Sequence, residues 1–223
     1  MTNFSWPDPP SQTAYPVARA GFPFILAASF TTAVLALLGL TVPALLGLVV
    51  SLFICFFFRD PDRVVPCIEN GLVAPADGKV VAVEELASSR FSDGPCRKIS
   101  IFMSVFNVHV NRIPCDATVQ QVRYFPGKFV SANLDKASTD NEHNAVYLIT
   151  ASGKSVCMVQ IAGLIARRII CGVQPGQSVQ RGQRMGLICF GSRVDVYLPV
   201  EAKISIQVGQ KVTAGASIIG EWT

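Results

Sequence analysis

The chain separates into one long apolar run near its start and a series of short alternating segments after it. Residues 21–58, roughly 38 positions, carry no charged side chain. This run is too long for one perpendicular membrane crossing, which needs about 20 apolar residues, and it suits two short helices. Leu40-Thr41-Val42-Pro43 provides the break between them. We therefore predict a membrane hairpin over 21–58. One tilted span is an alternative, and a cleaved signal peptide is disfavoured by the length and late start of the run.

The charges that flank the apolar run predict its orientation. Arg19 precedes it, and Arg59 and Arg63 follow it. Because cytoplasmic flanks of membrane segments are enriched in Lys and Arg, both ends of the hairpin are expected in the cytoplasm. The sequence thus predicts a polar, proline-containing cytoplasmic leader over 1–20. It also predicts a domain over 59–223 on the cytoplasmic face of the cytoplasmic membrane.

From residue 72 onward the pattern is typical of β-structure. Short runs rich in β-branched and aromatic residues alternate with Gly and Pro, so the domain after the hairpin should be mainly β. The clearest of these runs lie at 79–83, 98–103, 118–124, 145–150 and 155–161, with several more after Arg168.

One internal repeat refines the expected fold. Pro175-Gly176-Gln177-Ser178-Val179-Gln180-Arg181-Gly182 and Val208-Gly209-Gln210-Lys211-Val212-Thr213-Ala214-Gly215 share glycines, a valine and a glutamine, with Gly209 following Gly176 by 33 positions. The shared pattern, G-x-x-V-x-x-G, is typical of turns in biotinyl- and lipoyl-carrier-like sandwiches, where glycines permit tight corners. The predicted fold is a flattened β-sandwich, or barrel-sandwich hybrid, with lipoyl-like repeats and an N-terminal apolar helical hairpin.

Composition excludes several classes of site. The seven cysteines are odd in number and form no CxxC pair, so they are expected to be reduced and mostly buried. The net charge of +4 is modest and not clustered, which argues against nucleic acid as a partner and fits anionic lipid better. With His109 and His143 as the only histidines, the chain has no HxH or HExxH arrangement, so no metal centre is predicted.

The Gly191-Ser192 step, between two runs expected to be strands, is a candidate for self-cleavage. A serine hydroxyl can attack the preceding carbonyl, so that the acyl group moves from nitrogen to oxygen. Elimination of the ester then turns the serine into dehydroalanine and finally into a pyruvoyl group. A small residue in a strand turn is the plainer interpretation of Ser192. No G-x-S-x-G elbow surrounds it, so ordinary serine hydrolysis lacks support.

Several ordered motifs together resemble the pyruvoyl-dependent phosphatidylserine decarboxylases, in the short form of bacteria and archaea. The resemblance runs from residue 57 to the C-terminus. It rests on Phe-Phe-Arg-Asp-Pro at 57–61, Ala-Pro-Ala-Asp-Gly at 74–78, His-Val-Asn-Arg at 109–112, Lys-Ala-Ser at 136–138, Gln-Ile-Ala-Gly at 160–163, Ala-Arg-Arg at 166–168 and Phe-Gly-Ser-Arg-Val-Asp at 190–195.

The resemblance implies a role for each matching residue. Ser192 matches the serine that becomes the pyruvoyl group, with cleavage after Gly191 into residues 1–191 (the β chain) and 192–223 (the α chain). Asp77 matches the aspartate of the self-processing triad, which would orient an imidazole that removes the serine proton. An Asp-Gly turn is the plainer interpretation of Asp77.

The histidine segment departs from the pattern of long-form members, which carry histidines five and two positions before a proline. Here His109 stands five before Pro114, and Arg112 occupies the later position. Either His109 serves both self-cleavage and decarboxylation, or Asp77 works through another donor such as Arg112 or a water. A histidine satisfied within the sheet is the bland alternative.

Other polar residues are weaker candidates. The candidates for substrate binding are Arg112, Arg167 and Arg168. Arg167 and Arg168 could meet the lipid phosphate or the serine carboxylate, but alternation along a strand would let at most one of these two enter a pocket. Lys128, Asn133 and Lys136 could line the entry, or they could be solvated loop residues. His143 is expected in a loop near the site or on the surface.

Taken together, the resemblance implies a self-processing membrane proenzyme that converts phosphatidylserine to phosphatidylethanolamine and CO2. Its cofactor would be the pyruvoyl group made from Ser192, with neither pyridoxal phosphate nor a metal. Its partners would be the phospholipid substrate and its own second chain, and a higher homo-oligomer is left open. The alternatives are a membrane-tethered lipoyl-like adaptor or binding protein, and a pyruvoyl decarboxylase of a different amino-acid headgroup.

Overall fold

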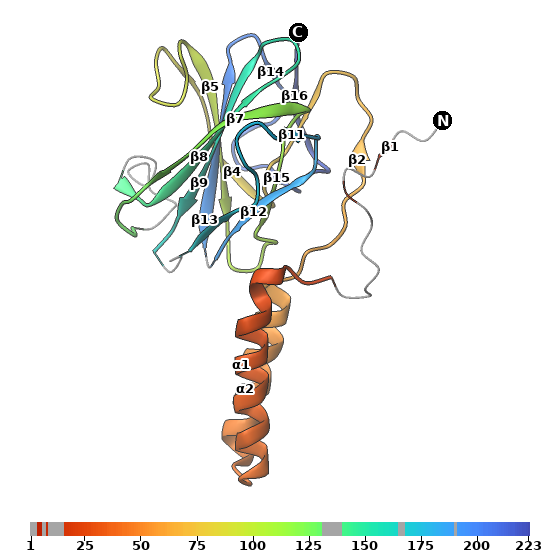
Figure 1. Ribbon diagram of the computed structural model, residues 1–223, viewed down its shortest axis with the longest axis vertical. Coiled ribbons are helices and arrows are strands. Elements are labelled where there is room, and N and C mark those ends of the chain that lie inside the picture. The colour runs from red at the N-terminus through yellow and green to blue at the C-terminus, as the bar shows by residue number, and fades with distance from the viewer. Residues whose placement is uncertain (1–3, 6–7, 9–15, 131–139, 165–167, 190) are drawn as a thin grey trace. The chain divides into compact units, whose positions relative to one another are not determined.

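The computed structural model describes residues 4–5, 8, 16–130, 140–164, 168–189 and 191–223 of the 223-residue chain (Figure 1). The chain forms two compact units. A helical unit covers Pro10–Asp62, and a β-rich unit combines Met1–Pro9 with Arg63–Thr223. Each unit is described by itself below.

The helical unit is a hairpin of two apolar helices. A short 3-10 turn, Arg19–Gly21, leads into α1 (Phe22–Leu37), and α2 (Thr41–Phe57) returns alongside it. Gly39, at φ +74°, reverses the chain between them, a conformation that glycine adopts without a steric penalty. At Gly47 the helices approach so closely that a Cβ would lie 2.7 Å from the Thr32 hydroxyl, which itself meets Ser51 Oγ at 3.2 Å.

The surface of the hairpin is apolar. Phe30, Leu37 and Leu46 are 72%, 88% and 64% exposed within the described chain. The stretch Arg19–Leu37 is long and apolar enough to cross a membrane by length and composition, whereas Thr41–Phe57 is shorter. Exposed apolar patches of this size are unusual in soluble domains and are consistent with membrane association.

A curled antiparallel sheet of eight strands forms the body of the β-rich unit (Figure 1). Its order is β11 (Ser178–Val179), β7 (Ala117–Phe125), β8 (His143–Ile149), β9 (Ser155–Ala162), β13 (Ser192–Pro199), β5 (Cys96–Met103), β4 (Gly78–Leu86) and β15 (Lys211–Val212). Two three-stranded sheets and one pair of strands accompany it. They are β10 (Ile169–Cys171), β12 (Arg184–Ile188) and β6 (Val110–Arg112); β14 (Lys203–Ile204), β16 (Ile218–Glu221) and β3 (Gly71–Val73); and β1 (Phe4–Ser5) with β2 (Val65–Pro66).

The two faces of the large sheet pack differently. The face that carries Met103, Val194 and Ala162, here called the inner face, belongs to the main hydrophobic core with the smaller sheets. The opposite, outer face carries a smaller cluster around Phe91 and Tyr197. Alternation of side chains along each strand produces this division. The prediction of a mainly β fold with an apolar helical hairpin is confirmed.

The sequence repeat folds into two equivalent turns. Gly176 and Gly209 have φ of +83° and +94°, and their N–H groups donate to the carbonyls of Val119 and Val80, each at a distance below 3 Å. Each turn then continues into a two-residue strand, β11 against β7 and β15 against β4. The repeat therefore encodes matching corners of the sandwich, as the glycine spacing indicates.

Two described pieces of the N-terminal leader belong to the β-rich unit. β1 pairs with β2, and the Asp8 carboxylate lies 3.3 Å from Arg184 Nη1. All seven cysteines are free thiols, four of them buried.

Candidate active site

Ser192 opens β13, which lies between β5 and β9 in the middle of the large sheet. It pairs with Met103 on one side and Ala162 on the other, and its side chain is fully buried on the inner face. The Ser192 hydroxyl donates to Met103 Sδ at 3.4 Å, a weak acceptor. Because this hydrogen bond is weak, breaking it costs the hydroxyl little free energy when the hydroxyl turns to attack a carbonyl.

Gly191 precedes the strand with φ +69°, a left-handed conformation that costs an L-residue about 1–2 kcal/mol. Its carbonyl, the one that Ser192 would attack, accepts a hydrogen bond from the Gly163 N–H at 3.1 Å. A donor already aimed at this oxygen stabilises the negative charge that develops there during attack.

His109 lies just before β6 and is fully buried. Its Nδ1 is 3.0 Å from the Asn107 carbonyl, which can only accept, so Nδ1 carries the proton and Nε2 presents a lone pair. The Gly191 N–H lies 3.4 Å from that Nε2. The unprotonated nitrogen of His109 is therefore directed at the residue before Ser192.

A buried amide network, which sequence reasoning missed, adjoins the serine. Gln160 Nε2 donates to Asn111 Oδ1 at 2.9 Å, and Asn111 Nδ2 points at Met103 Sδ at 3.6 Å. Asn144 Nδ2 donates to Gln160 Oε1 at 3.2 Å. The sequence does carry a signal for this network. Asn111, Asn144 and Gln160 stand at strand positions whose side chains face the core, where the alternating pattern would otherwise place apolar residues.

Asp77 is held in the turn before β4 by two contacts. Its Oδ2 accepts from Arg63 Nη2 at 2.9 Å, and its Oδ1 accepts from the Ala214 N–H at 2.7 Å. The contact with Ala214 connects Asp77 to the second turn of the repeat, and neither of these two contacts involves the His109 imidazole.

Arg112 is buried in β6 and follows Asn111, so its side chain leaves the strand on the opposite side. Its Nη1 donates to the Gly182 carbonyl at 2.8 Å and lies 3.7 Å from the Asp8 carboxylate. The structure thus places Arg112 against the first turn of the repeat.

Comparison with known proteins identifies the family. A family model described as phosphatidylserine decarboxylase matches residues 50–220. The chain is 50% identical over 206 residues to a protein of Syntrophus aciditrophicus (strain SB), covering 92% of this chain and 96% of that one. It is 47% identical over 210 residues to one of Desulfotalea psychrophila (94% and 98%) and 55% identical over 173 residues to one of Ralstonia pickettii (78% and 80%). All three are named phosphatidylserine decarboxylase proenzyme.

The chain belongs to the phosphatidylserine decarboxylase family. The prediction of an enzyme of this family is confirmed, and the comparisons favour it over the adaptor and over a decarboxylase of another headgroup.

The remaining residues that the sequence suggested for substrate binding or for the entry to the site are not among the contacts of Ser192 described above. Arg168 is exposed just before β10, and its carbonyl accepts from the Cys189 N–H at 3.0 Å. Lys128 is exposed at an isolated bridge with Asn141. Three further candidates, Asn133, Lys136 and Arg167, lie outside the described residues.

The expectation of a loop or surface position for His143 is wrong. His143 begins β8, is buried, and lies on the outer face, opposite to Ser192. Arg90 Nη2 lies 3.2 Å from its Nε2, and the Phe125 ring stacks on it at 4.7 Å between centroids. Burial lowers the pKa of this imidazole. The polar run Asn141-Glu142-His143 suggests a loop, but β8 already starts at His143. The side chain of His143 lies on the same outer face of the sheet as those of Ala145 and Tyr147, every second residue along the strand.

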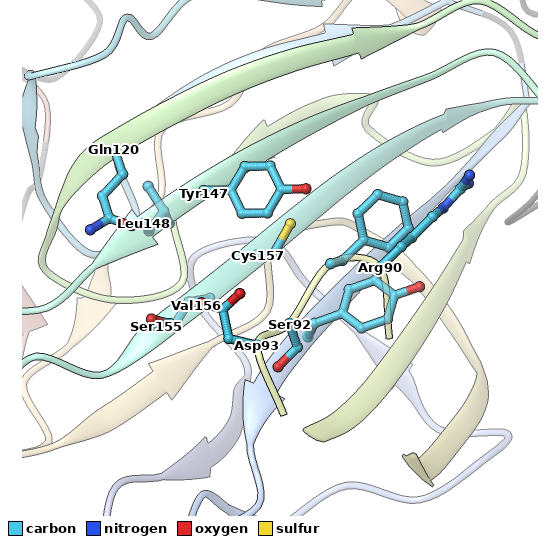
Figure 2. A pocket seen from close by; sticks show the side chains of 11 residues that line it. Arg90, Ser92, Asp93, Gln120, Tyr147, Leu148, Ser155, Val156 and Cys157 are labelled. Atoms are coloured by element: carbon cyan, nitrogen blue, oxygen red, sulfur yellow. The ribbon is translucent and has the colours of Figure 1, made fainter. Parts of the chain in front are cut away.

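A small cavity of about 70 Å³ also lies on the outer face. Figure 2 shows Tyr147 and Cys157 beside each other at this cavity, with Arg90 from the loop between β4 and β5. Burial raises the pKa of Tyr147 and of Cys157, so neither group is activated as a nucleophile. Within the described ranges, no group of three or more His, Cys, Asp or Glu residues could hold a metal ion.

Proposed function

We propose that the chain cuts itself between Gly191 and Ser192 and uses a pyruvoyl group made from Ser192 to convert phosphatidylserine to phosphatidylethanolamine and CO2. The observation that carries the proposal is the hydrogen bond from Gly163 to the Gly191 carbonyl, next to a buried serine hydroxyl. The word proenzyme in the names of the relatives also supports processing.

In the first step, Ser192 Oγ bonds to the Gly191 carbonyl carbon while the Gly163 N–H stabilises the oxyanion. His109 Nε2, which lies 3.4 Å from the Gly191 nitrogen, is the base that we assign to the serine proton. The C–N bond then breaks, the Ser192 nitrogen takes the proton, and an ester links the two residues.

In the second step, the ester is eliminated. Removal of the Ser192 α-proton expels the Gly191 carboxylate, which becomes the end of the β chain, and leaves dehydroalanine at position 192. Tautomerisation and hydrolysis by one water release ammonia and leave a pyruvoyl group at the start of the α chain.

The residues around Ser192 fit a buried group with two carbonyls. A pyruvoyl group supplies an electron-accepting carbonyl to which the substrate amine can bond. Asn111 Nδ2, held in place by Gln160, is a hydrogen-bond donor on the same side as Ser192 Oγ, since both contact Met103 Sδ. His109 is the group that we assign to hold the proton for the substrate carbon after CO2 leaves.

Roles for the other predicted residues follow from their contacts. Asp77 and Arg112 bind the two turns of the repeat, which supports positioning roles for both. Direct action of Asp77 on an imidazole stays a prediction. One of Arg167 and Arg168 is proposed to meet the phosphate or carboxylate of the substrate, as a guanidinium can.

The two chains are proposed to stay together after cleavage. The α chain would contribute β13, which is paired on both sides, and also β14, β15 and β16. We further propose that residues 21–58 tether the enzyme to the cytoplasmic membrane, with residues 1–20 and 59–223 on its cytoplasmic face, because Arg19, Arg59 and Arg63 flank the hairpin.

Intact mass measurement of the purified full chain tests self-cleavage. We expect two fragments, the smaller starting at a ketone-bearing residue 192, and an uncut, inactive Ser192→Ala variant. An uncut wild-type chain with normal decarboxylation would overturn the proposal. Assays on vesicles with serine or threonine headgroups separate the substrate from its alternative, since CO2 release from threonine alone would reassign it. A glycerol headgroup, which has no carboxyl group to lose, is the negative control.

A further inference from the structure

A second polar cavity lies on the outer face of the large sheet, over β4, β5 and β13. Its volume is about 420 Å³, within the usual range of roughly 300–1,000 Å³ for small-molecule sites. Its polar lining is Lys79, Lys98, Ser100 and Arg193. Arg193 and Ser192 are consecutive in a strand, so the cavity and the serine hydroxyl lie on opposite faces.

Ser100 supplies a donor that lacks an acceptor. Its side chain is 1% exposed, and within the described part of the chain its Oγ has no hydrogen-bond partner. A buried hydroxyl in this state is unfavourable, and natural proteins rarely retain one. Ser100 lines the cavity, and its buried Oγ would reach a ligand oxygen there by rotating about χ1.

The charges around the cavity are unbalanced. Lys98 Nζ lies 3.2 Å from Glu84, and Arg193 Nε lies 2.9 Å from Asp195. Lys79, by contrast, stands directly opposite Lys211 in the pairing of β4 with β15. Like charges directly opposite each other destabilise a sheet. Among the described residues, the three cations that line the cavity thus have two carboxylate partners, so the excess charge is positive; Lys211 lies outside the lining.

We propose that this cavity binds a phosphate group, either free or as the diester of a phospholipid headgroup. A tetrahedral phosphate offers enough oxygens to accept from Lys79 and the Ser100 hydroxyl together, and its charge of about −1 to −2 has the sign that the excess of positive charge requires. This site lies on the opposite face of the sheet from the proposed self-cleavage site, and the residues that support it are different ones.

Calorimetric titration of the full chain in detergent tests the proposal. The Ser192→Ala background prevents processing and turnover, so the outcome does not depend on the proposed function. The probes are inorganic phosphate, glycerophosphoglycerol and acetate. We expect saturable binding of at least one phosphate probe, weakened about tenfold or more by Lys79→Gln and severalfold by Ser100→Ala. Lys203→Gln, a lysine of β14 that is 71% exposed and outside the cavity, should bind like the parent.

The outcomes separate the sources of the phosphate. Tighter binding of glycerophosphoglycerol assigns the site to a lipid headgroup, and tighter binding of inorganic phosphate assigns it to the free ion. The proposal is overturned if neither phosphate probe binds, if acetate binds equally well, or if Lys79→Gln binds like the parent. Without phosphate, Ser100→Ala should melt no lower than its parent, because it removes an unpaired hydroxyl; this distinguishes lost binding from lost folding.

Discussion

The N–H of Gly163 donates to the carbonyl of Gly191 at 3.1 Å, across the boundary between the end of β9 and the start of β13. This bond fixes the orientation of the carbonyl that self-cleavage would attack. The alignment depends on the left-handed backbone of Gly191, so the conformation of one glycine and the reactivity of the next residue are linked.

Gly191→Ala should slow self-cleavage about tenfold, since a left-handed alanine costs about 1–2 kcal/mol and relaxation would move the carbonyl away from Gly163. The measurement is the loss of the uncut chain with time, followed by mass spectrometry. Gly153→Ala is the matched control, because Gly153 has φ +80° and equal free space around its Cα, and it lies in a remote turn. Equal slowing in both variants would contradict a specific role for Gly191.

His109→Ala should remain uncut for about 10² to 10⁴ times longer than the wild-type chain, the usual loss when a general base is removed. Fragment appearance on denaturing gels, from the moment of synthesis, measures this. His143→Phe, which changes the other histidine, should be processed at the normal rate. Normal processing of His109→Ala would transfer the role of base to another group.

Gln160→Leu should destabilise the fold by about 2–4 kcal/mol, because it leaves Asn111 Oδ1 and Asn144 Nδ2 buried without their partner. Urea unfolding of the uncut Ser192→Ala background gives the free energy. The exposed Gln174 provides the control as Gln174→Leu, which should cost less than about 0.5 kcal/mol. A cost as small for Gln160→Leu would mean that the amide network contributes no stability.

The stability of the β-rich unit should fall as the pH drops through about 6.5. Burial lowers the pKa of folded His143, while the Asn141 carbonyl opposes the shift, Arg90 adds to it and Asp195 opposes it. The unfolded chain therefore binds the proton more readily, and protonation favours unfolding. Urea unfolding between pH 5 and 8 should give a flatter profile for His143→Phe than for its parent. Identical slopes would show that another group is responsible.

A charge on the hairpin should weaken membrane association. Phe30 is 72% exposed, so Phe30→Lys places an ammonium on the surface of the hairpin, and a charge at the centre of a membrane helix costs about 2.5–3.5 kcal/mol. Flotation with liposomes of anionic and zwitterionic lipid measures the bound fraction. Tyr124→Lys, at a 56% exposed position of β7, should float like the wild-type chain, and equal behaviour of the two variants would argue against hairpin insertion.

Local patterns were enough to predict the hairpin and the two glycine turns. The uncharged run, the Leu40-to-Pro43 break and the G-x-x-V-x-x-G spacing each act within a few residues, so they can be read without tertiary structure. Gly191-Ser192 was found in the same way, from the chemistry of adjacent groups and from flanking motifs.

Pairing between distant strands could not be predicted in this way. The contact of Gln160 with Asn111 requires β9 and β6 to meet, and the position of His143 depends on where β8 starts. The Gly163 donor is a backbone N–H group, which every residue except proline has, so the residue type at position 163 does not predict it. Asp77 and Arg112 were weighed for chemistry, whereas their contacts with Ala214 and Gly182 appear only once the repeat is folded.

The central position of β13 has a consequence for how the enzyme can be handled. If the bond before Ser192 is cut as proposed, a strand paired on both sides would belong to a separate 32-residue chain that starts at Ser192 and ends at Thr223. Unfolding the cut enzyme would let that chain diffuse away, so refolding would become a second-order reaction that depends on concentration. The uncut precursor refolds in a first-order reaction. In dilute solution the cut enzyme would therefore persist because it unfolds slowly, whereas the uncut precursor would persist because it can refold.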